Sequence, residues 1–227
     1  MDPLNFIKIL APLITVVIAF IAGFIELRLN PKNWLNRWFA SFFFSASLAY
    51  LIYAIYHLLI FSPFIIISIA AVVTQIIFNF MILSLIMTVF VLEKFAEIAM
   101  SLKYLGIMAV AFILMSFGYF IWFPEVDPEF YAQAVINTIT PPVWFIFVNI
   151  CRMVVLIYVV IKYSLIIKKT EGEAKNRIRW FFIGILITIV GISFNLVGGI
   201  FNFILTEIIT LILINFGAII IVKGFFI

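Results

Sequence analysis

Long apolar runs separated by short polar connectors dominate this chain. Each run is at least about as long as the 20 residues that a helix needs to cross a hydrocarbon core. A chain in lipid must satisfy its own backbone hydrogen bonds, so runs of this length predict helices, and barrel strands of about 10 residues do not fit them. The predicted spans are 4–25, 38–61, 64–92, 104–123, 142–167, 180–201 and 206–226. The pattern predicts an all-α membrane protein with a single seven-helix transmembrane domain.

Charged residues on alternate connectors predict the orientation of the bundle. Lys and Arg occupy the first, third and fifth connectors and the end of the last span, whereas the second, fourth and sixth connectors contain neither. Connectors rich in Lys and Arg stay in the cytoplasm. We therefore expect a multi-pass protein of the cell membrane with its N-terminus outside and its C-terminus inside. The cationic residues are Arg28, Lys32, Arg37, Lys94, Lys103, Lys162, Lys168, Lys169, Lys175, Arg177, Arg179 and Lys223.

Composition supports the membrane assignment and excludes other classes. The chain is 67% hydrophobic and 11% charged, with a mean hydropathy of +1.33, whereas soluble domains are about 25% charged. The net charge of +4 is accounted for by the connectors, so the expected partner is the lipid bilayer and not nucleic acid. The N-terminal flank 1–8 holds one acid and one base, which is a poor cleavable signal, so the first run is kept as a helix.

Small residues and prolines mark the packing and the loops. Gly184, Gly191 and Gly198 repeat every seven residues, which predicts one close-packed face on the sixth span, with a hinge at Gly198–Gly199 as the alternative. The fourth connector, 124–141, contains several prolines and the acids Glu125, Asp127 and Glu129, and we expect it to be partly extended.

Arg152 is the most unusual residue because it lies within an apolar run. It follows the start of the fifth span by about ten residues, which is about 15 Å along a helix. A charge in lipid costs at least about 2.5 kcal/mol, so the side chain should face the bundle or a wet cavity. Its expected partner is Glu207, Asn149 or a cavity water.

Other polar residues lie at comparable depths on five of the predicted spans. Tyr50, Tyr53 and His57 form a stripe on the second span, and Gln75 and Asn79 lie one turn apart on the third. They indicate either a pocket in the outer half of the bundle or a set of hydrogen bonds between helices. The candidate ligand-binding residues are Arg152, Asn149, Trp144, Tyr53, His57, Gln75, Asn79, Asn195, Glu207 and Asn215, with Tyr50 and Asn202 near them.

Motifs of catalysis and cofactor binding are absent from the sequence. There is no His-Glu-x-x-His, Gly-x-Ser-x-Gly or phosphate-binding loop. His57 has no Cys or acid near it, so we expect no metal site. Lys223 lies at the end of the seventh span, where it anchors the topology and is not placed to hold retinal. The sequence predicts neither an enzyme nor a cofactor.

Two segments resemble a known family. Residues 29–39 read LNPKNWLNRWF, and residues 168–184 read KKTEGEAKNRIRWFFIG. Both are similar to the N-terminal seven-helix sensor region of bacterial and archaeal membrane histidine kinases, in their Asn-rich basic first inner loop and their Arg-x-Arg stretch before a Gly-containing sixth helix. The family usually continues into a cytoplasmic kinase domain, so the resemblance implies a sensor module that is either excised or stand-alone.

Three hypotheses follow for the function. The first is a receptor-like sensor that binds a small or lipophilic ligand and signals to a cytoplasmic partner through Lys168, Lys169, Arg177 and Arg179. The second is a small transporter or channel with Arg152 on its path. The third is a structural or assembly protein whose polar residues only pack helices. A homodimer is compatible with each of them.

The predicted orientation can be tested by cysteine labelling of intact cells. In a Cys151→Ala background, Gln133→Cys should react with a membrane-impermeant maleimide added outside, and Asn176→Cys should react only after the membrane is opened. The reverse pattern would show that the orientation is wrong.

Overall fold

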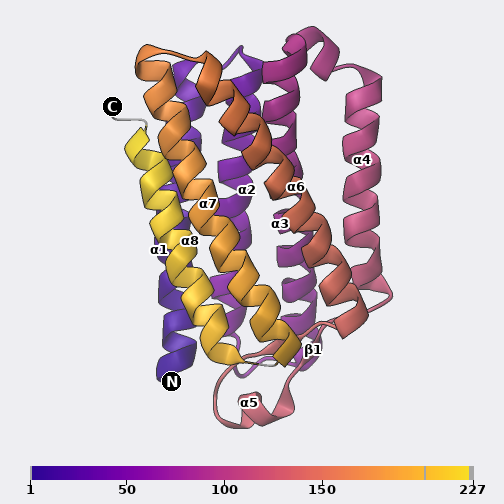
Figure 1. The fold of residues 1–227 in the computed structure, drawn as a ribbon. Helices are drawn as coiled ribbons and strands as arrows, with labels where there is room; N and C mark the ends of the chain where they lie inside the picture. The colour runs from indigo at the N-terminus through magenta and orange to yellow at the C-terminus, as the bar shows by residue number, and fades with distance from the viewer. Residues whose placement is uncertain (1, 202, 225–227) are drawn as a thin grey trace.

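Seven membrane-length helices form the protein, as the apolar runs predict (Figure 1). The computed structural model describes residues 2–201 and 203–224, and the count of seven refers to these residues. The long helices are α1 (Pro3–Leu29), α2 (Trp34–Leu58), α3 (Phe64–Ala99), α4 (Leu102–Phe117), α6 (Pro142–Lys169), α7 (Gly172–Phe201) and α8 (Ile204–Lys223). The prediction of an all-α seven-helix bundle is confirmed.

Short elements form the connection between α4 and α6. A 3-10 turn, η1 (Gly118–Phe120), extends α4, and α5 (Pro128–Ala132) lies between two strands, β1 (Glu125–Val126) and β2 (Thr138–Ile139). The strands pair antiparallel, with Val126 opposite Thr138. Asp127 caps α5 by accepting a hydrogen bond from the Glu129 amide at 2.9 Å. The connector is therefore partly extended, as its prolines predict.

Several helices are longer than their apolar runs, which corrects the predicted boundaries. The segment 168–179 was expected to be a connector, but α6 continues to Lys169 and α7 begins at Gly172. Hydropathy predicts only the part of each helix that lies in hydrocarbon. Charged residues with high helix propensity can extend the helix beyond that part. The helix α3 also continues past residue 92, although its backbone breaks at Phe95, where φ is 63°. Residues 202, 225 and 226, which fall in or beside predicted spans, lie outside the described residues.

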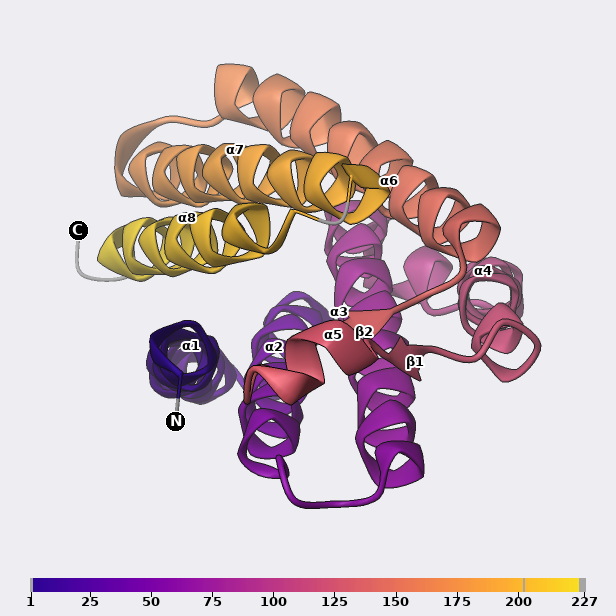
Figure 2. The same ribbon diagram turned by 90° about the horizontal axis from the view of Figure 1, so that it is seen from below.

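Six of the described helices surround a common centre (Figure 2). Contacts join α1 to α2, α2 to α3, α3 to α6, α6 to α7, α7 to α8, and α8 back to α1. The helix α4 lies outside this ring and packs against α3. Seen from below in Figure 2, α5 and the two strands lie across one end of the ring.

The connectors divide between the two ends of the bundle. The end that is lower in Figure 1 holds residue 2 and the connector 121–141 with its three acids, and we name it the acidic end. The opposite end holds the connectors 30–33, 100–101 and 170–171, and we name it the basic end because most of the Lys and Arg residues lie near it. The side of the membrane that each end faces stays a prediction.

The glycine repeat of α7 lies against α8. A Cβ atom added at Gly184 would lie 2.6 Å from the Gly217 carbonyl oxygen, closer than real Cβ contacts come. A Cβ atom at Gly191 would lie 3.3 Å from Leu213 Cβ, which is a tight contact, and one at Gly198 would overlap Thr206. The three glycines let the two helices approach closely, which is the packing role that their spacing predicts.

Aromatic side chains fill the ring near the basic end. Phe181 of α7 packs edge-on against Phe39 of α2, with ring centroids 5.1 Å apart, and lies at the same distance from Tyr163 of α6. The Tyr163 hydroxyl lies 2.7 Å from the hydroxyl of Thr88 on α3. Phe181 and Tyr163 belong to a buried core that also includes Ala22, Leu85, Val89 and Leu156, and Phe39 packs against it.

Candidate functional site

A cavity of about 250 Å³ lies at the centre of the ring. It is close to the lower end of the range of about 300–1,000 Å³ that is typical of small-molecule pockets. On α2 its lining extends from Phe42 to Tyr56, which corresponds to about 21 Å of helix. Near the acidic end its polar lining includes Tyr50, Tyr53, Tyr56, Gln75, Asn137, Thr138, Asn149, Arg152, Asn195 and Glu207. Toward the basic end its apolar lining includes Ala19, Phe42, Phe43, Ala46, Met81, Ile82, Ala218 and Ile221.

Arg152 points into the bundle and contacts the cavity. Its side chain is buried, and its guanidinium is held by two residues of α3. Nε and Nη2 donate to the Asn79 Oδ1 atom at 2.9 and 2.7 Å, and Nη1 donates to Gln75 Oε1 at 2.9 Å. A further bond runs from Nη2 to the Gln75 carbonyl at 3.1 Å. The prediction that Arg152 faces the interior is confirmed, but the predicted partners, Glu207 and Asn149, are wrong.

The amides that hold Arg152 are themselves fixed by α4 and η1. Asn79 is fully buried and donates to the Met115 carbonyl at 2.7 Å and to Ser116 Oγ at 3.2 Å. The Tyr119 hydroxyl donates to Gln75 Oε1 at 3.3 Å. Asn79 therefore joins α3, α4 and α6 and does not line the cavity. Gln75 joins α3 to η1 and α6, and it also lines the cavity.

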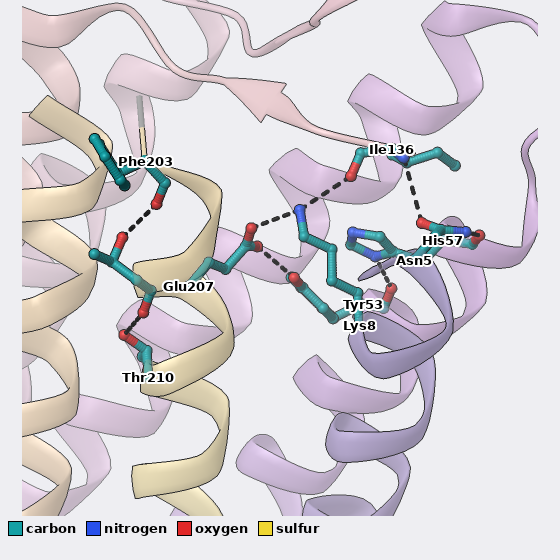
Figure 3. A network of polar contacts seen from close by, with 9 residues as sticks. Asn5, Lys8, Tyr53, His57, Ile136, Phe203, Glu207 and Thr210 are labelled. Carbon is teal, nitrogen blue, oxygen red and sulfur yellow. Dashed lines mark hydrogen bonds and ion pairs between the residues drawn. The ribbon is translucent and has the colours of Figure 1, made fainter. Parts of the chain in front are cut away.

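The partner of Glu207 is Lys8, and this ion pair joins α8 to α1 (Figure 3). The Lys8 Nζ atom lies 2.5 Å from Glu207 Oε2 and donates to the Ile136 carbonyl at 3.1 Å. The Tyr53 hydroxyl of α2 donates to the other carboxylate oxygen. Glu207 lies in the first turn of α8, where the helix dipole also favours a negative charge. One carboxylate thus connects three helices with the connector 121–141.

Asn5 and His57 complete the attachment of this connector. The Asn5 amide donates to the His57 carbonyl at 2.9 Å and accepts from the Ile136 amide at 3.3 Å. His57 is buried, with its Nδ1 atom 2.8 Å from the Tyr53 carbonyl, and it does not line the cavity. The Tyr131 hydroxyl donates to the Ile60 carbonyl on the other side of the connector. The segment that carries β2 is therefore held over the acidic end of the cavity.

The structure divides the ten predicted ligand-binding residues into two groups. Six of them line the cavity: Arg152, Asn149, Tyr53, Gln75, Asn195 and Glu207. The other four make contacts within the described bundle and do not line it. Asn215 donates to the Ala11 carbonyl at 3.0 Å and so ties α8 to α1, and Trp144 stacks on Trp122 with ring centroids 5.5 Å apart. His57, Asn79, Asn215 and Trp144 therefore contact other parts of the bundle, and a role for them in ligand binding stays a prediction.

Two buried charged residues were missed by the sequence analysis. Lys8 was counted with the N-terminal flank, yet it lies in the first apolar run, at the same end of the bundle as Glu207. A cation and a carboxylate at the same depth in two spans are a signal for pairing, and it could have identified this contact. Glu26 lies just beyond the first predicted span, 4–25, but it is buried in α1 and accepts a hydrogen bond from the Asn36 amide at 3.1 Å.

Metal binding and known relatives give no further information on the site. Among residues 2–201 and 203–224, no group of three or more His, Cys, Asp or Glu side chains could hold a metal ion. No protein-family model matches the sequence, and a comparison with curated proteins also finds no match. The resemblance to histidine-kinase sensor regions therefore rests on the two quoted segments and stays a prediction.

Breaking the Lys8–Glu207 pair should destabilise the bundle more than removing both charges. Glu207→Gln leaves the buried Lys8 ammonium without its partner, which costs about 3–5 kcal/mol of unfolding free energy. Lys8→Met leaves the Glu207 carboxylate, whose side chain is 23% exposed, so the loss should be smaller. The double variant should recover most of this loss. The measurement is a double-mutant cycle of reversible unfolding in bicelles.

The matched control for this cycle is the pair of Lys162 and Glu93, which is also close, at 2.7 Å, but partly exposed. Its disruption should cost less than about 1 kcal/mol. Additive losses at Lys8 and Glu207 would contradict the coupling that the geometry predicts.

Proposed function

We propose that the protein is a receptor-like sensor that binds a small or lipophilic ligand in the central cavity and signals to a cytoplasmic partner. The observation that carries the proposal is the cavity itself, with a buried Arg152 on its wall. A bundle that used polar residues only to join helices would have no need for a central space lined by several of them. Residues such as Asn79 and Asn215 do serve that packing role, and they lie off the cavity.

The distribution of the lining favours binding over transport. The cavity reaches the connector at the acidic end, where Asn137 and Thr138 line it. Toward the basic end its described lining reaches Ile221 near the end of α8 but includes no residue of the connectors 30–33, 100–101 or 170–171. A transport path needs access to both faces, so a binding site fits this arrangement better.

The helices that line the cavity also provide a route to the basic end. Both α7 and α8 contact the cavity, and they meet again where Lys223 Nζ lies 4.2 Å from the Trp180 ring centroid. Arg177 and Arg179 are exposed on the first turns of α7, near Lys168 and Lys169 at the end of α6. A ligand can change this surface only if it binds two helix arrangements with different affinity. With the basic end in the cytoplasm, these four cations would be the readout surface.

Filling the cavity tests the binding function. Ala46 is buried and lines the apolar part of the cavity, so Ala46→Phe should occupy space that a ligand needs. We expect a thermal-stability screen of small lipophilic acids, alcohols and amines to yield compounds that stabilise the wild type. A compound at 100 times its Kd adds about 2.7 kcal/mol to the native state. The same compounds should not stabilise Ala46→Phe.

The matched control for the screen is Ala109→Phe, on the exposed face of α4. It adds the same side chain away from the cavity and should respond as the wild type does. If every active compound stabilises all three proteins equally, or if none stabilises the wild type, the binding function is wrong.

Neutralising the basic surface tests the readout. Arg177→Gln with Arg179→Gln should remove photo-cross-links between residue 176 and a cytoplasmic partner, because the cations that would contact that partner are lost. Membrane insertion and orientation should stay unchanged. The control is Lys94→Gln with Lys103→Gln, which removes the same charge from α3 and α4 where they meet the connector 100–101 at the same end.

The alternative is that these cations only hold the topology or contact anionic lipid, at about 1 kcal/mol each. Cross-links that survive in the Arg177 and Arg179 variant would show that this alternative is correct, as would a variant that fails only in insertion.

A further inference from the structure

The charges around the cavity do not balance. Glu207 and Arg152 both line it, but the Glu207 carboxylate is already paired with Lys8. The groups around the Arg152 guanidinium are the neutral side chains of Gln75, Asn79 and Tyr119 and one backbone carbonyl, and no carboxylate of residues 2–201 and 203–224 lies within ion-pair distance of it. One positive charge is therefore left on the cavity wall without a counter-charge.

Hydrogen-bonding groups with no partner in the described part of the chain lie on the same wall. The Tyr50 side chain is 6% exposed and lines the cavity, and its hydroxyl makes no hydrogen bond to any described residue. The Asn195 amide also lines the cavity without a hydrogen bond to that part of the structure. Tyr50 is buried and Asn195 is half-buried, and the polar end of a ligand in the cavity would satisfy both groups.

We propose, building on the ligand-binding function above, that the ligand is a small amphipathic monocarboxylate whose carboxylate pairs with Arg152. One carboxylate balances the one unpaired charge and accepts hydrogen bonds from the guanidinium and the Tyr50 hydroxyl. A dianionic phosphate ester would replace the positive excess by a negative one in a medium of low dielectric constant, which is costly. A cationic ligand would place like charges together.

The apolar part of the cavity fits the rest of such a ligand. From Tyr50, the lining continues along α2 to Phe42, about 12 Å toward the basic end. Ala46, Met81, Ile82 and Ile221 surround this part. A cavity of about 250 Å³ holds on the order of eight to ten non-hydrogen groups, so the ligand has a short alkyl chain or a single ring beside its carboxylate.

Photolabelling with three matched probes tests this assignment. The full chain in phosphatidylcholine nanodiscs is exposed to an eight-carbon carboxylate that carries a diazirine, to the corresponding alcohol and to the corresponding amine. The carboxylate should label the segment of α2 around Ala46 saturably, in competition with unlabelled octanoate, and at least about ten-fold more tightly than the alcohol, because it alone makes charge-assisted bonds to Arg152. A sixteen-carbon carboxylate is supplied in the nanodisc lipid. Labelling by this probe would show that the ligand enters from the bilayer and not from the aqueous phase.

Variants assign the selectivity to named groups. Arg152→Gln should weaken carboxylate labelling at least about ten-fold and leave alcohol labelling unchanged. Carboxylate labelling of Arg152→Lys should lie between that of the wild type and that of Arg152→Gln. Tyr50→Phe keeps the ring and removes only the hydroxyl, so it should weaken carboxylate labelling about three- to ten-fold. It keeps the assignment testable even if Arg152→Gln folds poorly.

The possible outcomes separate the two proposals. Equal labelling by carboxylate and alcohol, with no effect of Arg152→Gln or Tyr50→Phe, would overturn the carboxylate assignment while leaving a cavity that binds ligands. Preferential labelling by the amine would also overturn it. If no probe labels the cavity saturably, and Ala46→Phe gives the same pattern as the wild type, the binding function itself fails.

Discussion

The ion pair between Lys8 and Glu207 closes the ring of helices at the acidic end. It joins α1 to α8, and through Tyr53 and Ile136 it also involves α2 and the connector over the cavity. The buried Lys8 ammonium would be costly without a counter-charge, so its contact with Glu207 holds α8 against α1. The pair therefore determines where α8 lies, and the glycine seam then places α7.

The same pair determines which partners are available to Arg152. Because Glu207 is used by Lys8, Arg152 is held by the neutral amides of Gln75 and Asn79, and its charge faces the cavity. This arrangement costs stability, since amides solvate a buried guanidinium without neutralising it. A cost of this kind at a cavity wall is typical of functional sites, where local stability is given up for binding.

The sequence predicts the fold better than it predicts the site. Apolar runs of about 20 residues determine the number of helices because lipid admits few other structures. The depth of Arg152 likewise predicts that it faces inward. Its partners could not be predicted, because Glu207, Asn149, Gln75 and Asn79 all lie at plausible depths and only the packing of α3 against α6 selects among them. Helix ends were missed where polar residues extend α2, α3 and α7 beyond the hydrocarbon.

The central claim is that a ligand occupies the space beside Arg152. The most direct measurement is an experimental structure of the full chain purified from its own membranes in a mild detergent. The account predicts ordered non-protein density in contact with the Arg152 guanidinium and the Tyr50 hydroxyl, with Lys8 and Glu207 paired above it. A structure in which side chains fill the centre of the ring, or in which Arg152 pairs with Glu207, would contradict it.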